Sequence, residues 1–125
     1  MATRRKPESP PPDLDRESKQ LWKVAYAQLV ADHGGTFPEA MLPTLERYVR
    51  AAERGRLARK LATKEGLTVV GSQGQPVQNP NLKTAREAEQ DAHRYATDLL
   101  LTPASRKRRE DPKATGAKGP FDDAF

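Results

Sequence analysis

The stretch whose residue types most suggest chemistry is the turn Gly71-Ser72-Gln73-Gly74. Backbone amides in tight turns of this kind bind anions, so the turn could form a phosphate cradle. A phosphate-binding loop, however, runs from a strand directly into a helix and carries a Gly-Lys-Ser/Thr sequence, which is missing here. The β-prone runs on either side, residues 67–70 and 75–78, instead predict a β-hairpin with the turn as its loop.

Other residues that could support catalysis or metal binding are scattered. His33 and His93 are the only histidines and fall on different predicted helices. His33 lies at a helix end, where an imidazolium would complement the helix dipole, and His93 lies on a polar face. There is no cysteine, and no serine or carboxylate stands in a nucleophile-elbow or paired-acid pattern. We therefore expect no enzymatic activity, no metal and no cofactor.

Basic residues carry more information, because 22 Lys and Arg against 17 Asp and Glu give a formal charge of +5. That excess is compatible with a polyanionic partner. The candidate DNA-binding residues are Arg4, Arg5, Lys6, Arg47, Arg50, Arg54, Arg59, Lys60, Arg106, Lys107, Arg108 and Arg109. The five in the middle share a predicted helix, where they form either a solvated face with local ion pairs or a surface that follows phosphates. We expect the two outer clusters to lie in flexible segments, which bind a DNA backbone through counterion release and distinguish little sequence.

The chain closes on Phe121-Asp122-Asp123-Ala124-Phe125, which combines aromatic side chains with acidic ones. One interpretation is a solubilising terminus. The other is a linear motif that docks its phenyl rings into a partner's groove, with Phe121, Asp122, Asp123 and Phe125 as candidate partner-docking residues.

Three helices and the hairpin are expected to position these residues. A first helix is predicted after the N-cap Asp13, with an apolar stripe that includes Trp22 and Leu29, and it should end at Gly34-Gly35. Thr36-Phe37-Pro38-Glu39 fits a capping box for a second helix that ends at Gly66. Pro43 predicts either a kink or a short turn with a fresh helix start.

After the hairpin, Asn79-Pro80-Asn81 should cap a third long helix, and Thr102-Pro103 could begin a short turn. The predicted fold is mainly α, with two N-terminal helices, a short β-hairpin and a third long helix. Residues 1–12 should be a disordered basic and proline-rich arm. Residues 13–103 should form a helical oligomerisation core with the hairpin near 67–78, and residues 104–125 should be a flexible basic, then acidic-aromatic tail.

The predicted core is small. Only 35% of residues are hydrophobic and 6% aromatic, so a domain of this size would gain stability by associating with copies of itself. No apolar run is long enough to cross a membrane, and the first residues lack the apolar segment of a signal peptide. We expect a soluble, cytoplasmic protein with no membrane partner.

From about residue 13 to residue 109 the sequence resembles the small subunits of tailed-phage terminases, of the type with a helix, helix, hairpin, helix core. The resemblance is carried by GSQGQPVQNPNLKTAREAEQDAHRYATDLLLTPASRKR. This stretch looks like the family's glycine turn, its proline before a long helix, and a closing LGLTP.SR.R pattern. Leu45-Glu46-Arg47-Tyr48 also resembles the family. Leu100 stands where the family usually has glycine, which is a departure at the turn into Thr102.

The resemblance implies a non-enzymatic packaging factor that forms a homo-oligomeric ring and binds double-stranded viral DNA. It also implies a large terminase subunit, with ATPase and nuclease activity, as the partner that is recruited and regulated. In phages with this type of small subunit, an HNH endonuclease is often an additional partner. The expected location is the host cell cytoplasm, outside the mature virion.

Two other functions fit the composition. One is a virion structural or head-tail connector protein that binds only protein. The other is a host-type transcriptional regulator, which would need a recognition helix and a two-fold dimer.

Overall fold

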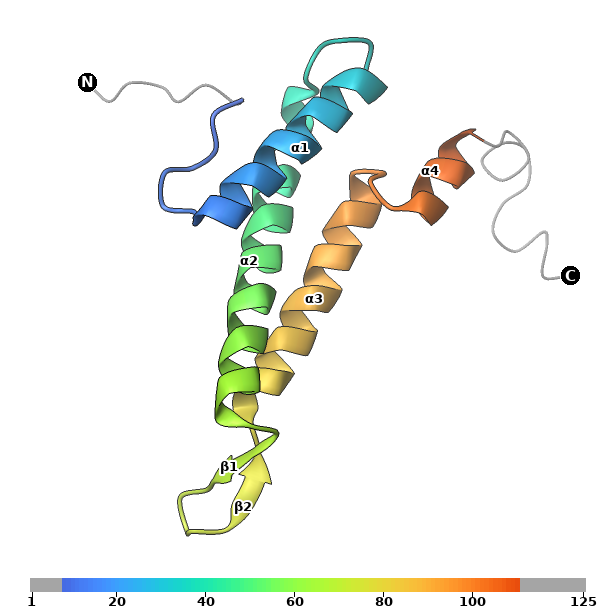
Figure 1. The fold of residues 1–125 in the computed structure, drawn as a ribbon. Helices are drawn as coiled ribbons and strands as arrows, with labels where there is room; N and C mark the ends of the chain where they lie inside the picture. Colours follow the sequence, from blue (N-terminus) through green and yellow to red (C-terminus); the bar gives the residue numbers. More distant parts are fainter. Residues whose placement is uncertain (1–7, 111–125) are drawn as a thin grey trace, which may run out of the picture.

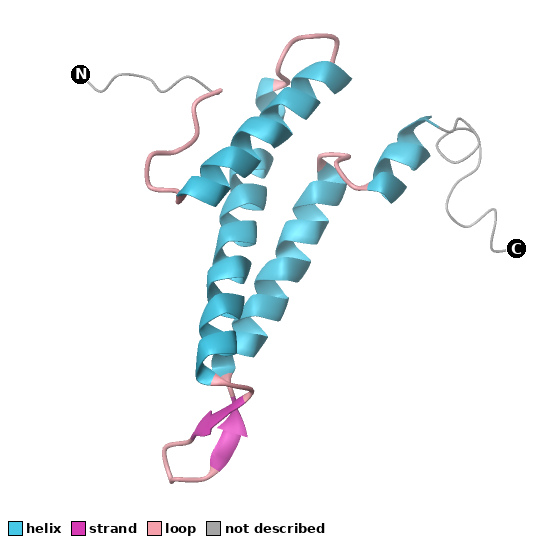
Figure 2. Ribbon diagram, viewed as in Figure 1, coloured by secondary structure: helices cyan, strands magenta, loops and turns pink. Residues whose placement is uncertain are grey.

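The computed structural model describes residues 8–110, which form four α-helices, one 3₁₀ turn and one two-stranded sheet (Figure 1). In chain order these elements are α1 (Arg16–Asp32), η1 (Glu39–Met41), α2 (Leu42–Glu65), β1 (Thr68–Val70), β2 (Pro76–Gln78), α3 (Pro80–Asp98) and α4 (Pro103–Glu110). Helices α2 and α3 run side by side and the hairpin closes one end of the pair (Figure 2). Helix α1 packs against the other end of α2. The mainly helical fold with its hairpin confirms the prediction.

The N-cap of α1 is Asp15, so the prediction of Asp13 was wrong. The Asp15 side chain accepts a hydrogen bond from the Ser18 amide at 2.9 Å. Asp13 is instead drawn to α2, where its carboxylate accepts from both terminal nitrogens of Arg50 at 2.7 and 3.2 Å. Leu14 is buried, although it precedes the helix. A capping side chain two positions later explains the shift, because capping depends on geometry that composition alone does not specify.

The apolar core lies between α1, the first half of α2 and the end of α3. Trp22, Leu29, Leu45 and Val49 are fully buried there, together with Leu99. Beyond the C-terminus of α1, Phe37 folds back so that its ring stacks on Tyr26, with ring centroids 4.3 Å apart. Burying each such side chain stabilises the folded state by about 1.5–3 kcal/mol. This core holds α1 to the α2–α3 pair.

The entry into α2 differs from the predicted capping box. Neither Thr36 nor Glu39 caps the helix: Pro38 precedes the 3₁₀ turn η1 and makes no side-chain cap bond. The reason is that Phe37 is drawn into the core and the chain turns tightly after it. Helix α2 then starts afresh with Pro43 in its first turn, where the missing N–H costs nothing, as one of the two predicted outcomes required. It ends at Gly66, whose φ of 100° favours glycine.

Small residues line the contact between α2 and α3. The small buried residues are Ala51, Gly55, Ala58 and Ala62 on α2 and Ala85, Ala88, Ala92 and Ala96 on α3. A Cβ added at Gly55 would lie 3.2 Å from the Cγ of Glu89 and 3.4 Å from the Cβ of Ala88. The two helices therefore approach closely, and only small side chains fit between them.

The hairpin and the start of α3 match their predictions. Strands β1 and β2 are antiparallel, with Val69 opposite Val77 and Val70 opposite Pro76. Asn79 caps α3 by accepting from the Asn81 amide at 2.9 Å. Its buried amide nitrogen also donates to the Gly66 carbonyl at 2.9 Å. Asn79 thus joins the end of α2 to the start of α3 across the hairpin.

The chain leaves α3 through Leu100, whose φ of 59° lies in the left-handed region. The Leu101 amide donates to the Ala96 carbonyl at 2.8 Å, and the Leu100 amide donates to the Thr97 carbonyl at 3.0 Å. This is a Schellman motif, in which the residue at the position of Leu100 is usually glycine. The departure from the family pattern therefore falls on a residue with the backbone conformation that glycine favours.

Helix α4 occupies residues that were expected to be flexible. The Thr102 amide donates to the Ser105 hydroxyl at 3.2 Å, and the Ser105 amide donates to the Thr102 hydroxyl at 3.1 Å. This reciprocal capping box, with Pro103 at the first helical position, starts α4. The prediction of a flexible segment from residue 104 is thus corrected for residues 104–110. The short turn predicted at Thr102-Pro103 is the start of this helix, which continues to Glu110.

Candidate nucleic-acid interface

Three of the predicted DNA-binding arginines on α2 are paired with carboxylates. Arg50 contacts Asp13 and Glu46, Arg54 lies 3.7 Å from Asp91, and Arg59 lies 2.6 Å from Glu89. Hydrogen bonds to carboxylates raise the pKa of the Arg50 and Arg59 guanidinium groups. Each of these arginines therefore has its charge compensated within the chain, which favours the interpretation of this part of α2 as an ion-paired face.

A fourth paired arginine, Arg56, was not singled out from the sequence. It contacts the carboxylate of Asp15 and lies 3.1 Å from Glu17, so α2 is tied to the first turn of α1. The Arg56 hydrogen bond and the Ser18 amide lower the pKa of Asp15 to about 2. The partners are separated by about 40 positions in the chain, so local spacing could not reveal the pair.

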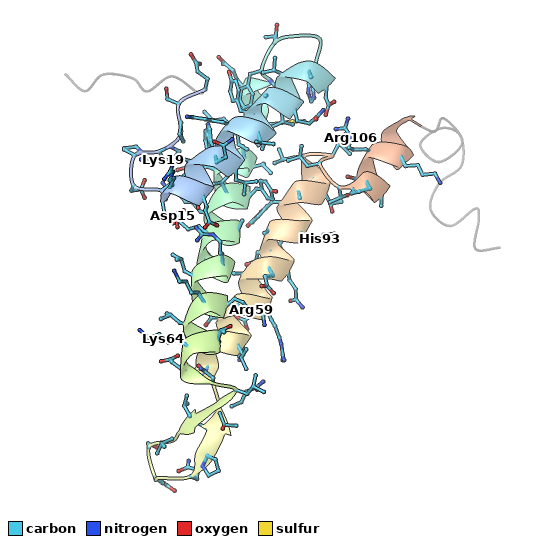
Figure 3. All side chains as sticks on the ribbon, in the orientation of Figure 1. Asp15, Lys19, Arg59, Lys64, His93 and Arg106 are labelled. Atoms are coloured by element: carbon cyan, nitrogen blue, oxygen red, sulfur yellow. The ribbon has the colours of Figure 1, made fainter. Side chains whose placement is uncertain are left out.

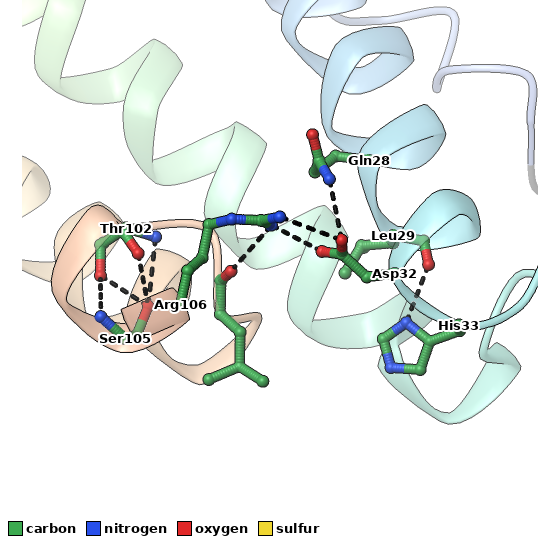
Figure 4. A network of polar contacts seen from close by, with 8 residues as sticks. Gln28, Leu29, Asp32, His33, Thr102, Ser105 and Arg106 are labelled. Carbon is green, nitrogen blue, oxygen red and sulfur yellow. Dashed lines mark hydrogen bonds and ion pairs between the residues drawn. The ribbon is translucent and has the colours of Figure 1, made fainter. Parts of the chain in front are cut away.

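Arg106 is also paired, on the opposite end of α1. Its two terminal nitrogens donate to the two carboxylate oxygens of Asp32 at 2.7 and 3.1 Å (Figure 4). Gln28 donates to the same carboxylate at 2.9 Å. Arg106 was expected to belong to a flexible basic cluster, and the structure instead places it in a fixed contact between α4 and α1.

Among residues 8–110, the predicted candidates Arg47, Lys60 and Lys107 make no salt bridge. All three are exposed, on α2 and α4. Arg108 and Arg109 lie in α4, beyond the side chains that the structure describes. The candidates Arg4, Arg5 and Lys6, and the docking candidates Phe121, Asp122, Asp123 and Phe125, lie outside the described residues.

A second basic group was missed by sequence reasoning. Arg16, Lys19 and Lys23 stand on α1 with a spacing of three and four residues, which brings them to one side of the helix. Arg16 and Lys23 are exposed, Lys19 is half-buried, and none of the three forms a salt bridge within the described part of the chain. Their spacing of three and four residues is the signal in the sequence, and it overlaps the apolar stripe of the same helix.

The described residues meet neither the requirements of a metal site nor those of a membrane-spanning helix, and both histidines lie among them. Within residues 8–110 no three or more His, Asp or Glu side chains come together as metal ligands would, and none of the helices there has the length and apolar composition of a membrane span. The Nδ1 of His33 donates to the Leu29 carbonyl at 2.8 Å at the end of α1, which is a capping contact. The side chain of His93 is exposed on α3 (Figure 3). It lines an open hollow with Arg86, Glu89 and Gln90.

Comparison with known protein families gives a match over most of the chain. The family model described as phage terminase, small subunit, matches residues 18–115, which is most of the chain. No curated protein and no solved structure matches. Small subunits of this family are generally non-catalytic and work in genome packaging with DNA and a large subunit. The chain therefore belongs to the phage terminase small-subunit family.

Proposed function

We propose that this protein is a non-enzymatic, DNA-binding adaptor of a phage packaging motor. It recognises viral double-stranded DNA, assembles into a homo-oligomeric ring, and recruits and regulates the large terminase subunit that carries the ATPase and nuclease. It acts in the host cytoplasm and is left behind when the virion matures. The observation that carries the proposal is the family match over residues 18–115.

Charge supports the DNA-binding part of the proposal. The chain has a net charge of +5, and Arg47, Lys60 and Lys107 are exposed without a salt bridge in the described residues. With the basic clusters of Arg4, Arg5 and Lys6 and of Arg108 and Arg109, they supply positive charge for a phosphate backbone. Repeated around a ring, a modest charge per subunit gives a strong attraction, because several weak contacts act together.

Exposed apolar side chains support the assembly part. Leu57 and Leu61 lie one turn apart on α2 and are 43% and 49% exposed, whereas the neighbouring Ala58 and Ala62 are buried against α3. Leu67 and Val70 on and beside the hairpin are 74% and 78% exposed. A two-helix layer leaves these side chains with no partner in its own core, so packing against a second subunit would bury them.

The proposed docking of the large subunit rests on the aromatic and acidic residues 121–125, and an HNH endonuclease is a further proposed partner. Deleting residues 121–125 should leave assembly and DNA binding intact and weaken capture of the large subunit. A pull-down by the truncated protein that equals that of the full chain would contradict this role.

Native mass spectrometry of the full chain, with and without duplex DNA, tests the proposal as a whole. The expected spectrum shows a single closed oligomer that gains the mass of the duplex. A monomer that ignores DNA would overturn the proposal. Recovery of the polypeptide from purified mature particles would favour a virion structural or connector protein instead.

A further inference from the structure

We propose that the exposed face of α1 formed by Arg16, Lys19 and Lys23, called here the α1 basic face, is the principal surface that binds the phosphate backbone of duplex DNA. This inference rests on the proposed function and names the part of the described chain that would perform it. It differs from the sequence prediction, which placed the fixed candidates on α2.

The three cations lie on one side of α1. With about 100° between successive residues, Arg16, Lys19 and Lys23 fall within an arc of about 60° on α1. Trp22, Ala25 and Leu29, the buried positions of the same helix, lie on another side and face the core. The seven helical steps from Arg16 to Lys23 span about 10 Å, which is the rise of about three phosphates along one DNA strand.

Within residues 8–110 the three cations of this face make no salt bridge. Glu17 is the only acidic residue between positions 16 and 23, and it turns toward α2, where it lies 3.1 Å from Arg56. The N-cap Asp15 also pairs with Arg56. Because Arg56 pairs with both carboxylates, Arg16, Lys19 and Lys23 stand close together on α1 without a salt bridge in the described part of the chain.

The α2 surface differs from the α1 basic face both in the spacing of its cations and in their pairing with carboxylates. Most of its arginines are paired with carboxylates. The α2 cations without a salt bridge among residues 8–110 are Arg47, Lys60 and Lys64, and Arg47 lies 13 positions, or about 20 Å of helix, from Lys60. Lys60 and Lys64 also flank the exposed Leu57 and Leu61, an apolar surrounding that suits a protein partner. Figure 3 shows Lys19 on α1 and Lys64 far from it, near the hairpin end of α2. A phosphate backbone is better matched by the continuous cations of α1.

The chain outside the described residues is compatible with this placement. Arg4, Arg5 and Lys6 are joined to the first described residue, Glu8, and the chain then enters α1 at Arg16. Two of the three acidic residues in this segment are paired with α2, Asp13 with Arg50 and Asp15 with Arg56. The third, Glu8, interacts electrostatically with Tyr26 of α1 and makes no salt bridge within residues 8–110. The two basic groups are thus covalently connected through a segment of fewer than ten residues.

The test measures binding of the full chain to a fluorescent duplex by anisotropy over a range of salt concentrations. The variant R16Q/K19Q/K23Q should flatten the slope of log K against log salt by about 2.7 for each subunit in contact with DNA, since each phosphate contact contributes about 0.9. The matched control R47Q/K60Q/K64Q removes the same charges, one arginine and two lysines, from exposed positions of α2. It should change the slope by less than half as much.

The possible outcomes distinguish failure of the proposed function from failure of the assignment of the α1 basic face. If the unmodified chain binds no DNA at 50 mM salt, the proposed function fails. If it binds and the two triple variants change the slope equally, or the α1 variant leaves it unchanged, only the α1 basic face is overturned. R16K/K19R/K23R keeps the charge and should retain the slope. Should R16Q/K19Q/K23Q fail to fold, the single variant K23Q must flatten the slope by about 0.9 for the assignment to stand.

Discussion

Arg106 and Asp32 form a bidentate ion pair that holds α4 against the last turn of α1, with nitrogen–oxygen distances of 2.7 and 3.1 Å. The Asp32 side chain is only 9% exposed, and its partner is 33% exposed. Paired charges this well covered interact more strongly than surface ones, and removing one partner leaves the other desolvated. The arginine in the family-like sequence TPASR therefore fixes the position of α4.

Replacing Arg106 by Gln should release α4 from α1 and lower the free energy of unfolding by about 1–3 kcal/mol, because the Asp32 carboxylate loses its main donors. Urea denaturation and amide exchange in α4 would measure both effects. Lys107→Gln removes the same charge from the next, exposed position and should cost less than about 0.5 kcal/mol. Equal losses for the two variants would mean that the ion pair does not hold α4.

Position 100 should accept glycine better than it accepts another apolar residue such as isoleucine. A left-handed backbone costs an L-residue about 1–2 kcal/mol, and glycine removes that cost. We expect the unfolding free energy of Leu100→Gly to stay within about 1 kcal/mol of the parent, and Leu100→Ile to be the less stable of the two. The matched variant is Leu99→Gly, at a buried site without left-handed strain, which should lose several kcal/mol. The opposite ranking of Leu100→Gly and Leu100→Ile in thermal unfolding would contradict the Schellman assignment.

Gly55 sets the separation of α2 and α3. Gly55→Leu should destabilise the protein by about 1–3 kcal/mol, because the added atoms meet Glu89 and Ala88 at sites that are already filled. Gly55→Ala should be nearly neutral, since its tight Cβ contact opposes a gain of about 1 kcal/mol in helix propensity. Thermal melts of the two variants measure the difference. A Leu variant as stable as the Ala variant would show that the helices can separate freely here.

Asp15 should make stability depend on pH in the acid range. Its pKa is lowered from 3.8 to about 2, chiefly by the Arg56 hydrogen bond, so the folded state favours the ionised carboxylate. The resulting stabilisation is complete above the unfolded-state pKa and is lost as the pH falls through about 2. Asp15→Asn should therefore melt lower than the parent at pH 6, with the gap narrowing toward pH 2. The exposed Asp98→Asn removes the same charge, and an identical pH profile for both variants would refute the assignment.

Local patterns in the sequence predicted most of the fold. Periodic apolar residues specified the helices, and Pro43, Gly66 and Asn79 marked ends that the structure confirms. The cap was misplaced at Asp13 because the contact of Asp13 with Arg50, 37 positions away, cannot be seen in local sequence. The turn predicted at Thr102-Pro103 does begin α4, but its continuation as a helix to Glu110 was not predicted.

The candidate interface was harder to predict, because it depends on which charges remain after the helices pack. Arg50, Arg54 and Arg59 looked equivalent to Arg47 in sequence, yet carboxylates 4 to 37 positions away compensate only the first three. The α1 basic face was visible as a spacing pattern. Its significance emerges only from the packing, which turns Glu17 toward α2.

The most direct test of a DNA-binding packaging adaptor is the affinity of the full chain for duplex DNA at 50 and 200 mM salt. The proposal predicts clear binding at the lower concentration and a loss of at least tenfold at the higher one, because phosphate contacts release counterions. Absence of binding at 50 mM salt, or an affinity that does not change between the two concentrations, would contradict it.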